Sequence, residues 1–256
     1  MTSGSLLYAI LPHLLYNSET WTNISKRTVE ILEDIQYMFM RYLLATPRTC
    51  PIPSLLWETG GMLMELRIHK KKLLFLHHLL NLPETSLANE IAKTQIKFQY
   101  PGLMTECEEL MTKYNLPGVY KHSKLEWKRI VDRKLRDHNK KTLLSKIKNY
   151  RKLNHRELEK EEFETKPYLK KLNLPDTRLK FALRTHMTRT VQANYKGDPR
   201  YKSNDWKCQV CQVLDTQEHI VRCPMYRSLR SDKDLSNDKD LIDYFRKVID
   251  VRSKVE

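Results

Sequence analysis

MLMELRIHKKKLLFLHHLLNL, residues 62–82, consists mainly of helix formers and ends directly before Pro83. Its apolar side chains are Leu63, Leu66, Leu73 and Leu80, together with Ile68, Phe75 and Leu79. A helix with a single apolar stripe needs one neighbour, whereas apolar residues on several faces need cover on more than one side. The segment therefore predicts a long helix that is buried on two sides.

Helical patterns dominate the rest of the chain. Glycine is scarce, with six residues in 256, and no stretch shows convincing strand alternation, so we expect a mainly α fold. The expected helices cover residues 25–45, 85–99, 103–114, 123–149, 156–164 and 176–195. In the first of these helices the apolar stripe is expected at Ile31, Ile35, Met38 and Tyr42, with Leu32, Phe39 and Leu43 beside them. Asp176 is the expected N-cap of the last one.

The net charge of +15 is spread unevenly. Residues 1–60 hold four Lys/Arg and five Asp/Glu, whereas residues 121–205 hold 25 Lys/Arg and 11 Asp/Glu. A localised positive field of this size attracts polyanions, in a way that depends strongly on salt. An ordinary hydrated helical surface is the alternative, but its charge would be mixed more evenly. The distribution favours a nucleic-acid partner, RNA or DNA.

The segment CQVCQVLDTQEHIVRC, residues 208–223, has the spacing C-x2-C-x7-H-x3-C. Two cysteines three apart can present both thiolates from one turn, and His219 and Cys223 lie on one face of a helix. Asp215 and Glu218 form a candidate capping box for that helix. Four N/S ligands, Cys208, Cys211, His219 and Cys223, describe a closed, structural Zn²⁺ site. Lys207, Arg222 and Arg227 can offset its charge; a chance cluster is the alternative interpretation.

Aromatic residues alternate with cations just before this segment. Such a mixture suits single-stranded nucleic acid, since bases stack on the rings while cations follow the phosphates. Alternatively, Trp206 packs against the zinc site and the tyrosines end the preceding helix. The candidate nucleic-acid contacts are Lys180, Arg184, Arg189, Tyr195, Lys196, Arg200, Tyr201, Lys202, Trp206 and Lys207.

Catalytic motifs are not found in the sequence. It holds no Asp-Asp dipeptide, no G-x-S-x-G and no phosphate-binding loop, and His77-His78 lack a nearby carboxylate, so a core position suits them better. We expect neither an enzyme nor a small-molecule substrate.

No stretch is long and apolar enough to cross a membrane, so no membrane partner is expected. The five cysteines suit metal better than disulfides and argue against secretion, and Cys50 and Cys107 are expected to be buried. We expect an intracellular, nuclear protein.

Three blocks of sequence resemble the C-terminal portion of a non-LTR (LINE-type) retrotransposon reverse transcriptase. The first is LLYNSETW, residues 14–21, which is similar to the block where the palm gives way to the thumb. The second is PSLLWETGG, residues 53–61. The third is RLKFALRTHMTRTVQANYKG, residues 178–197, followed by the cysteine–histidine segment and Cys223-Pro224. Their order matches that of the family.

The resemblance implies a thumb and linker that grip nucleic acid, with a Cys-Cys-His-Cys zinc knuckle as an additional contact. Its regions would be a thumb-like helical region (1–120), a basic helical linker (121–200), the knuckle (201–230) and a tail (231–256). The resemblance implies no polymerase activity here, because the family's metal-binding aspartates lie upstream of the thumb. Only 33 residues follow Cys223, too few for the endonuclease of some members, so we expect a truncated element.

We therefore expect a non-catalytic nucleic-acid-binding fragment, whose oligomeric state the sequence does not define. A zinc-stabilised helical module that binds an acidic protein, and a decayed reading frame without function, remain alternatives.

Overall fold

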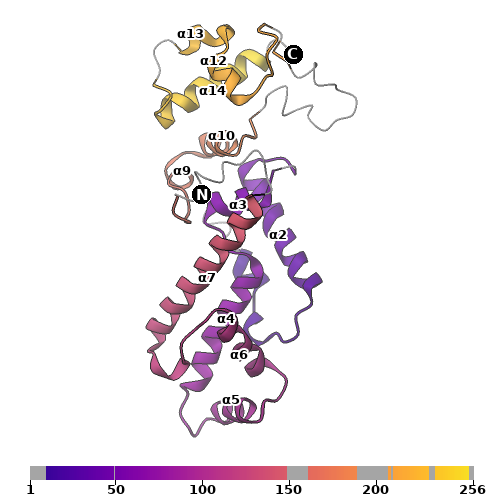
Figure 1. The fold of residues 1–256 in the computed structure, drawn as a ribbon, viewed down its shortest axis with the longest axis vertical. Coiled ribbons are helices and arrows are strands. Elements are labelled where there is room, and N and C mark those ends of the chain that lie inside the picture. The colour runs from indigo at the N-terminus through magenta and orange to yellow at the C-terminus, as the bar shows by residue number, and fades with distance from the viewer. Residues whose placement is uncertain are drawn as a thin grey trace. The chain divides into compact units, whose positions relative to one another are not determined.

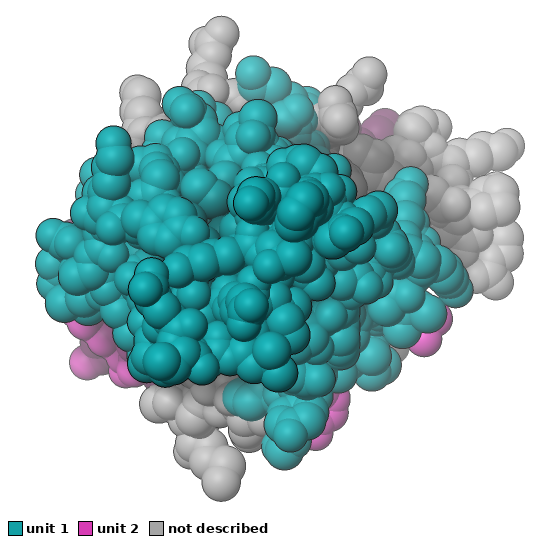
Figure 2. Space-filling view, turned by 90° about the horizontal axis from the view of Figure 1, so that it is seen from below, with its two compact units in different colours: residues 1–40, 51–166 teal, residues 41–50, 167–256 magenta. Residues whose placement is uncertain are grey.

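The computed structural model describes residues 10–48, 50–148, 161–188, 207–208, 210–230 and 234–253. This part of the chain is mainly helical, as expected (Figure 1). None of its helices is both long and apolar enough to cross a bilayer. The chain divides into unit 1, residues 1–40 and 51–166, and unit 2, residues 41–50 and 167–256, which Figure 2 distinguishes by colour.

The helices of unit 1 are the 3₁₀ helix η1 (Ser18–Thr20), most of α2 (Lys26–Leu44), α3 (Ile52–Thr59), α4 (Met64–Leu80), α5 (Leu87–Phe98), α6 (Leu103–Lys113), the 3₁₀ helix η2 (Val119–Lys121) and α7 (Lys124–Ile147). Those of unit 2 are the last turn of α2, α9 (Tyr168–Lys171), α10 (Leu174–Arg184), α12 (Gln217–Arg222), the 3₁₀ helix η4 (Pro224–Tyr226), α13 (Arg227–Arg230) and α14 (Asp238–Ser253).

Helix α4 is the centre of unit 1. It packs against α7, α6, α5 and η1, which surround it on several sides (Figure 1). Met64 and Leu73 are completely buried, and Leu66 and Ile68 nearly so. This arrangement confirms the prediction of a helix buried on two sides. His77, expected in the core, is buried and its Nε2 lies 3.0 Å from the carbonyl oxygen of His122.

Helix α7 is buried along every fourth residue. The fully buried positions are Trp127, Val131, Leu135, Asn139, Leu143 and Ile147. Because four residues exceed one helical turn by about 40°, this stripe winds around α7 instead of running straight. A winding stripe lets one helix contact two neighbours, and α7 packs against both α4 and α3.

Two polar side chains in the buried stripe fix the position of α7. The indole Nε1 of Trp127 donates to the carbonyl of Leu73 in α4, at 2.9 Å. The amide of Asn139 donates to the carbonyl of Gly61 at 3.0 Å and accepts from the N–H of Leu63 at 3.4 Å. These backbone groups lie in the turn between α3 and α4. Asn139 therefore satisfies buried polar groups that the helices leave unpaired.

The α3–α4 turn requires glycine at position 60. Gly60 ends α3 with a left-handed φ of 62°, and a Cβ there would lie 2.5 Å from the backbone nitrogen of Thr165. Both the backbone conformation and the close approach exclude a larger residue. The second block of the sequence resemblance, residues 53–61, is thus helix α3 and its glycine cap.

Helix α2 forms where expected, but of its expected apolar residues only Leu32 is buried. Ile31, Met38 and Tyr42 are exposed, and the buried positions are Leu32, Gln36, Tyr37, Met40 and Leu44. The buried face includes Gln36, whose side-chain amide donates to the carbonyl of Met62 at 3.2 Å. Apolar periodicity alone could not identify a buried glutamine.

The remaining helices were located with varying accuracy. Helices α5 and α6 lie within the expected ranges, whereas residues 161–164, the described end of the expected helix at 156–164, are not helical. Helix α10 ends at Arg184, well before residue 195, and its N-cap is Asn173 instead of Asp176. The Asn173 side chain accepts from the N–H of Asp176 at 3.0 Å, while the Asp176 carboxylate pairs with Arg246.

Unit 2 has its own hydrophobic core, which brings α10, the cysteine–histidine segment and α14 together. Its buried members are Leu183, Cys208, Ile220, Cys223, Tyr226, Tyr244, Phe245 and Val248. The boundaries differ from the four regions expected from the sequence. Residues 124–147 pack with the other helices of unit 1, and residues 238–253 belong to the core that contains the cysteines.

Replacement of Asn139 by alanine is expected to destabilise the chain by about 1–3 kcal/mol, because two buried backbone groups lose their partner. Chemical denaturation followed by circular dichroism measures the change. Ser145→Ala, at an exposed position on the same helix, is the control and should stay within about 0.5 kcal/mol of wild type. Equal stability of the two variants would contradict the role assigned to Asn139.

Candidate metal centre

The first two cysteines lie at the ends of a tight turn. The N–H of Cys208 donates to the carbonyl of Val213 at 2.7 Å, and the N–H of Gln212 donates to the carbonyl of Cys208 at 2.9 Å. Lys207 and Leu214 form an antiparallel bridge that closes the turn. Gln212 has a left-handed φ of 57°, which reverses the chain directly after Cys211. Both thiols are thus presented from one turn, as the spacing predicted.

The other two candidate ligands lie on α12. His219 is in the helix and Cys223 is its C-cap residue, so they share one face, as expected. The expected capping box is wrong, because the N-cap is Thr216, whose side chain accepts from the N–H of His219 at 3.1 Å. Asp215 has a different role in the structure.

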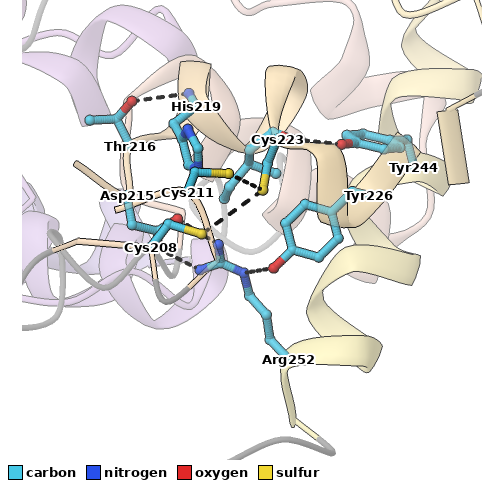
Figure 3. Close-up of polar contacts among 10 residues, drawn as sticks. Cys208, Cys211, Asp215, Thr216, His219, Cys223, Tyr226, Tyr244 and Arg252 are labelled. Carbon is cyan, nitrogen blue, oxygen red and sulfur yellow. Dashed lines mark hydrogen bonds and ion pairs between the residues drawn. The ribbon is translucent and has the colours of Figure 1, made fainter. Parts of the chain in front are cut away.

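The four side chains converge on one point (Figure 3). Their potential ligand atoms all lie within 4.8 Å of one another. The sulfur of Cys223 lies 3.9 Å from that of Cys208 and 3.5 Å from that of Cys211. A disulfide would need about 2.05 Å. Thiolates at about 2.3 Å from a tetrahedral metal lie about 3.8 Å apart, so the separations suit ligands of one ion.

The histidine supports this interpretation. The Nε2 atom of His219 is buried and has no hydrogen-bond partner among the described residues. A buried polar nitrogen without a partner is costly, and a metal ion would satisfy it. Cys208, Cys211, His219 and Cys223 can therefore hold a metal ion.

Backbone N–H groups donate hydrogen bonds to the sulfur atoms of Cys208 and Cys223. Burial raises the pKa of Cys208, but hydrogen bonds from the backbone of Cys211 and Val210 outweigh it and bring the pKa below its ordinary value. Burial raises the pKa of Cys223 to about 11, against a hydrogen bond from the backbone of Met225. Donors that point at sulfur stabilise the thiolate form, which is the form that binds metals.

A buried ion pair joins the metal centre to α14. The guanidinium of Arg252 donates to both carboxylate oxygens of Asp215, at 2.8 and 2.7 Å, and its Nε donates to the hydroxyl of Tyr226 at 3.0 Å (Figure 3). Asp215 is 1% exposed. The hydroxyl of Tyr244, also in α14, donates to the carbonyl of Ile220 at 2.8 Å. These contacts fix the segment that carries the ligands.

Sequence reasoning missed Arg252 and Tyr244 because nothing local marks them. They lie more than 20 residues beyond the last ligand, in a segment expected to be a tail. The aromatic and apolar spacing of Tyr244, Phe245 and Val248 is the one signal that could have indicated a buried helix. Of the cations expected to offset the site's charge, Arg222 and Arg227 are exposed.

Three of the expected nucleic-acid contacts lie in the described part of the chain. Lys180 forms an ion pair of 2.6 Å with Asp238, and its side chain is only 11% exposed, so it joins α10 to α14. Arg184 and Lys207 are half-buried. The other expected contacts, which lie outside the described residues, are Arg189, Tyr195, Lys196, Arg200, Tyr201, Lys202 and Trp206.

Comparison with family models, curated proteins and solved structures finds no match for this chain. The fold and the metal centre therefore define its class: a mainly helical protein with a C-terminal Cys/His cluster able to bind a metal ion.

Replacement of Arg252 by methionine is expected to destabilise unit 2 by about 3–5 kcal/mol, because it removes the guanidinium that pairs with both oxygens of the buried Asp215 carboxylate. Limited proteolysis and thermal unfolding of the full chain measure the effect. The control is Arg246→Met on the same helix, whose ion pair with Asp176 is half-exposed and worth about 0–1 kcal/mol. Similar unfolding temperatures for both variants would contradict the proposed importance of the buried pair.

Proposed function

We propose that this chain is a nucleic-acid-binding protein in which a structural zinc ion holds unit 2 together and basic helical surfaces bind phosphates. The observation that carries the proposal is the cationic side of α7. Residues 121–148 hold eleven Lys/Arg and three Asp/Glu. Among the described residues, none of the lysines and arginines of α7 forms an ion pair. Cations that the fold leaves unpaired are available to a polyanion.

The donor set supports zinc as the metal. Three thiolates and one imidazole are soft to borderline ligands, which suit zinc better than magnesium or calcium. Cys208 and Cys223 are buried, and the four protein ligands would complete a tetrahedron around the ion. A closed site of this kind stabilises a fold and leaves no open position for a substrate. The zinc would thus supply rigidity to the segment between α10 and α14.

The three blocks that resemble a non-LTR retrotransposon reverse transcriptase support the nucleic-acid partner. They fall in η1, in α3 with its glycine cap, and in the stretch from α10 to α12. Under this proposal the chain corresponds to the family's thumb, linker and knuckle, which would grip RNA or DNA without carrying the polymerase centre. A catalytic role is not part of the proposal.

One observation favours a second candidate function, a zinc-stabilised protein-interaction module. Helix α5 and the turn after it expose Leu87, Ile91, Phe98 and Tyr100, each about half exposed or more. Exposed apolar groups that lie close together are typical of protein-binding surfaces. A partner captured from cell extract that remains bound after nuclease treatment would favour this candidate over nucleic-acid binding.

The purified chain is expected to bind one Zn²⁺ or Co²⁺, and Co²⁺ should show the charge-transfer absorption of thiolate ligands. Metal binding requires deprotonated thiols, so protons should be released on binding and the affinity should fall as the pH is lowered. The variant Cys211→Ala should lose the signal. Cys107→Ala, a buried cysteine outside the cluster, is the control and should keep it. A metal signal retained in Cys211→Ala would contradict the ligand assignment.

RNA and single-stranded DNA binding is expected to weaken by orders of magnitude between about 50 and 200 mM salt, since phosphate contacts release counterions. Fluorescence anisotropy across a salt series measures the slope. The double variant Cys208→Ser/Cys211→Ser should bind more weakly. Unchanged affinity would remove the zinc segment from the binding surface, and a flat salt response would contradict nucleic-acid binding itself.

A further inference from the structure

The exposed cations of α7 follow the same four-residue spacing as its buried stripe. Positions one and two residues after each buried residue hold Lys128, Arg129, Arg133, Arg136 and Lys141, all exposed. We call these five residues the basic ridge. Because the ridge and the stripe advance together, the ridge stays on the side of α7 away from α4 and α3 along most of the helix. In Figure 1, α7 runs as one long helix along the edge of unit 1.

The acidic residues near the basic ridge cancel little of its positive charge. Asp132 is paired with Lys70 of α4 and is therefore neutralised by the fold. Asp137 is exposed and lies between Arg133 and Lys141 on the same side. No member of the ridge forms an ion pair with any other described residue. The ridge thus runs from Lys128 to Lys141, about 20 Å along a rigid helix of 24 residues, and winds around the helix together with the buried stripe.

The ridge contains no aromatic residue. Trp127 is the one tryptophan, tyrosine or phenylalanine of α7, and it is completely buried. Proteins that prefer single strands gain about 1–3 kcal/mol per base by stacking on exposed rings. A surface made only of cations has no such contribution and binds through phosphates alone. It therefore favours the nucleic acid with the higher charge density and the more rigid backbone.

We propose that the basic ridge binds the phosphate backbone of double-helical nucleic acid, independently of base sequence. The inference deepens the proposed function and rests on it. A duplex carries one charge per about 1.7 Å and loses little conformational freedom on a rigid surface. From Lys128 to Lys141 the ridge spans about 20 Å, more than half of one turn of B-form duplex, about 34–36 Å. With five phosphate contacts, the logarithm of the binding constant should fall with the logarithm of the salt concentration with a slope of about 4.5 for duplex and about 3.5 for single strands. Near 0.1 M salt this difference in slope favours duplex about tenfold.

The test compares the full chain with two triple variants that remove the same charge from unit 1. Arg129→Gln/Arg133→Gln/Lys141→Gln removes part of the ridge, and Lys26→Gln/Arg27→Gln/Lys97→Gln removes exposed cations elsewhere. The probes are labelled duplex DNA and duplex RNA of about 20 base pairs, two helical turns, and one of their single strands. Circular dichroism confirms that both variants are folded, which is expected because all six positions are exposed.

The ridge variant should lower the duplex salt slope by about 2.7 and weaken duplex binding more than about 100-fold near 0.1 M salt. The control variant should change the affinity for duplex by less than about threefold, since charges far from the binding surface are screened. Asp137→Asn should strengthen duplex binding. Similar losses in both triple variants, or tighter binding of the single strand by wild type, would overturn the inference and leave the proposed function intact. If wild type binds none of the probes, the proposed function fails as well.

Discussion

The fold of unit 1 depends on the burial of one winding stripe of α7 against α4 and α3. Apolar residues at every fourth position make that contact, and Trp127 and Asn139 fix it through hydrogen bonds to buried backbone groups. Once this side is buried, most of the lysines and arginines between the buried positions are exposed, whereas Lys134 and Lys140 are half-buried. The basic surface is thus a consequence of the packing, because one spacing places both sets of residues on opposite sides of the helix.

The fold of unit 2 likewise depends on a small number of buried contacts. Its described helices are short, apart from α10 and α14, and short helices contribute little stability of their own. Four convergent ligands, a buried Asp215–Arg252 pair and the side chains of α14 hold the segment between them. The metal centre and the C-terminal helix therefore form one structural element, because Arg252 contacts the loop that lies between the two pairs of ligands.

Sequence reasoning located α2, α4, α5, α6 and α7, but it did not predict α3 or α14 and expected a helix at 156–164 whose described end is not helical. The position of α4 and the range of α7 were predictable because apolar residues recur there at helical spacing, whereas the buried Asn139 carries no apolar signal. The face of α2 was not, since the buried Gln36 and the exposed Met38 reverse the usual relation between polarity and exposure. The helix caps Asn173 and Thr216 were displaced from the expected Asp176 and Asp215, because each aspartate is bound by an arginine of α14 instead.

By itself the sequence determined the helical class, the concentration of positive charge and the four candidate ligands. These follow from residue type and local spacing, which are properties of a short window. Only the tertiary structure decided that α14 belongs to the metal centre, that Lys180 is paired, and which cations of α7 remain unpaired. These facts depend on residues that are far apart in the chain. Whether a charged side chain is free to bind a partner is decided only when the fold has placed its neighbours.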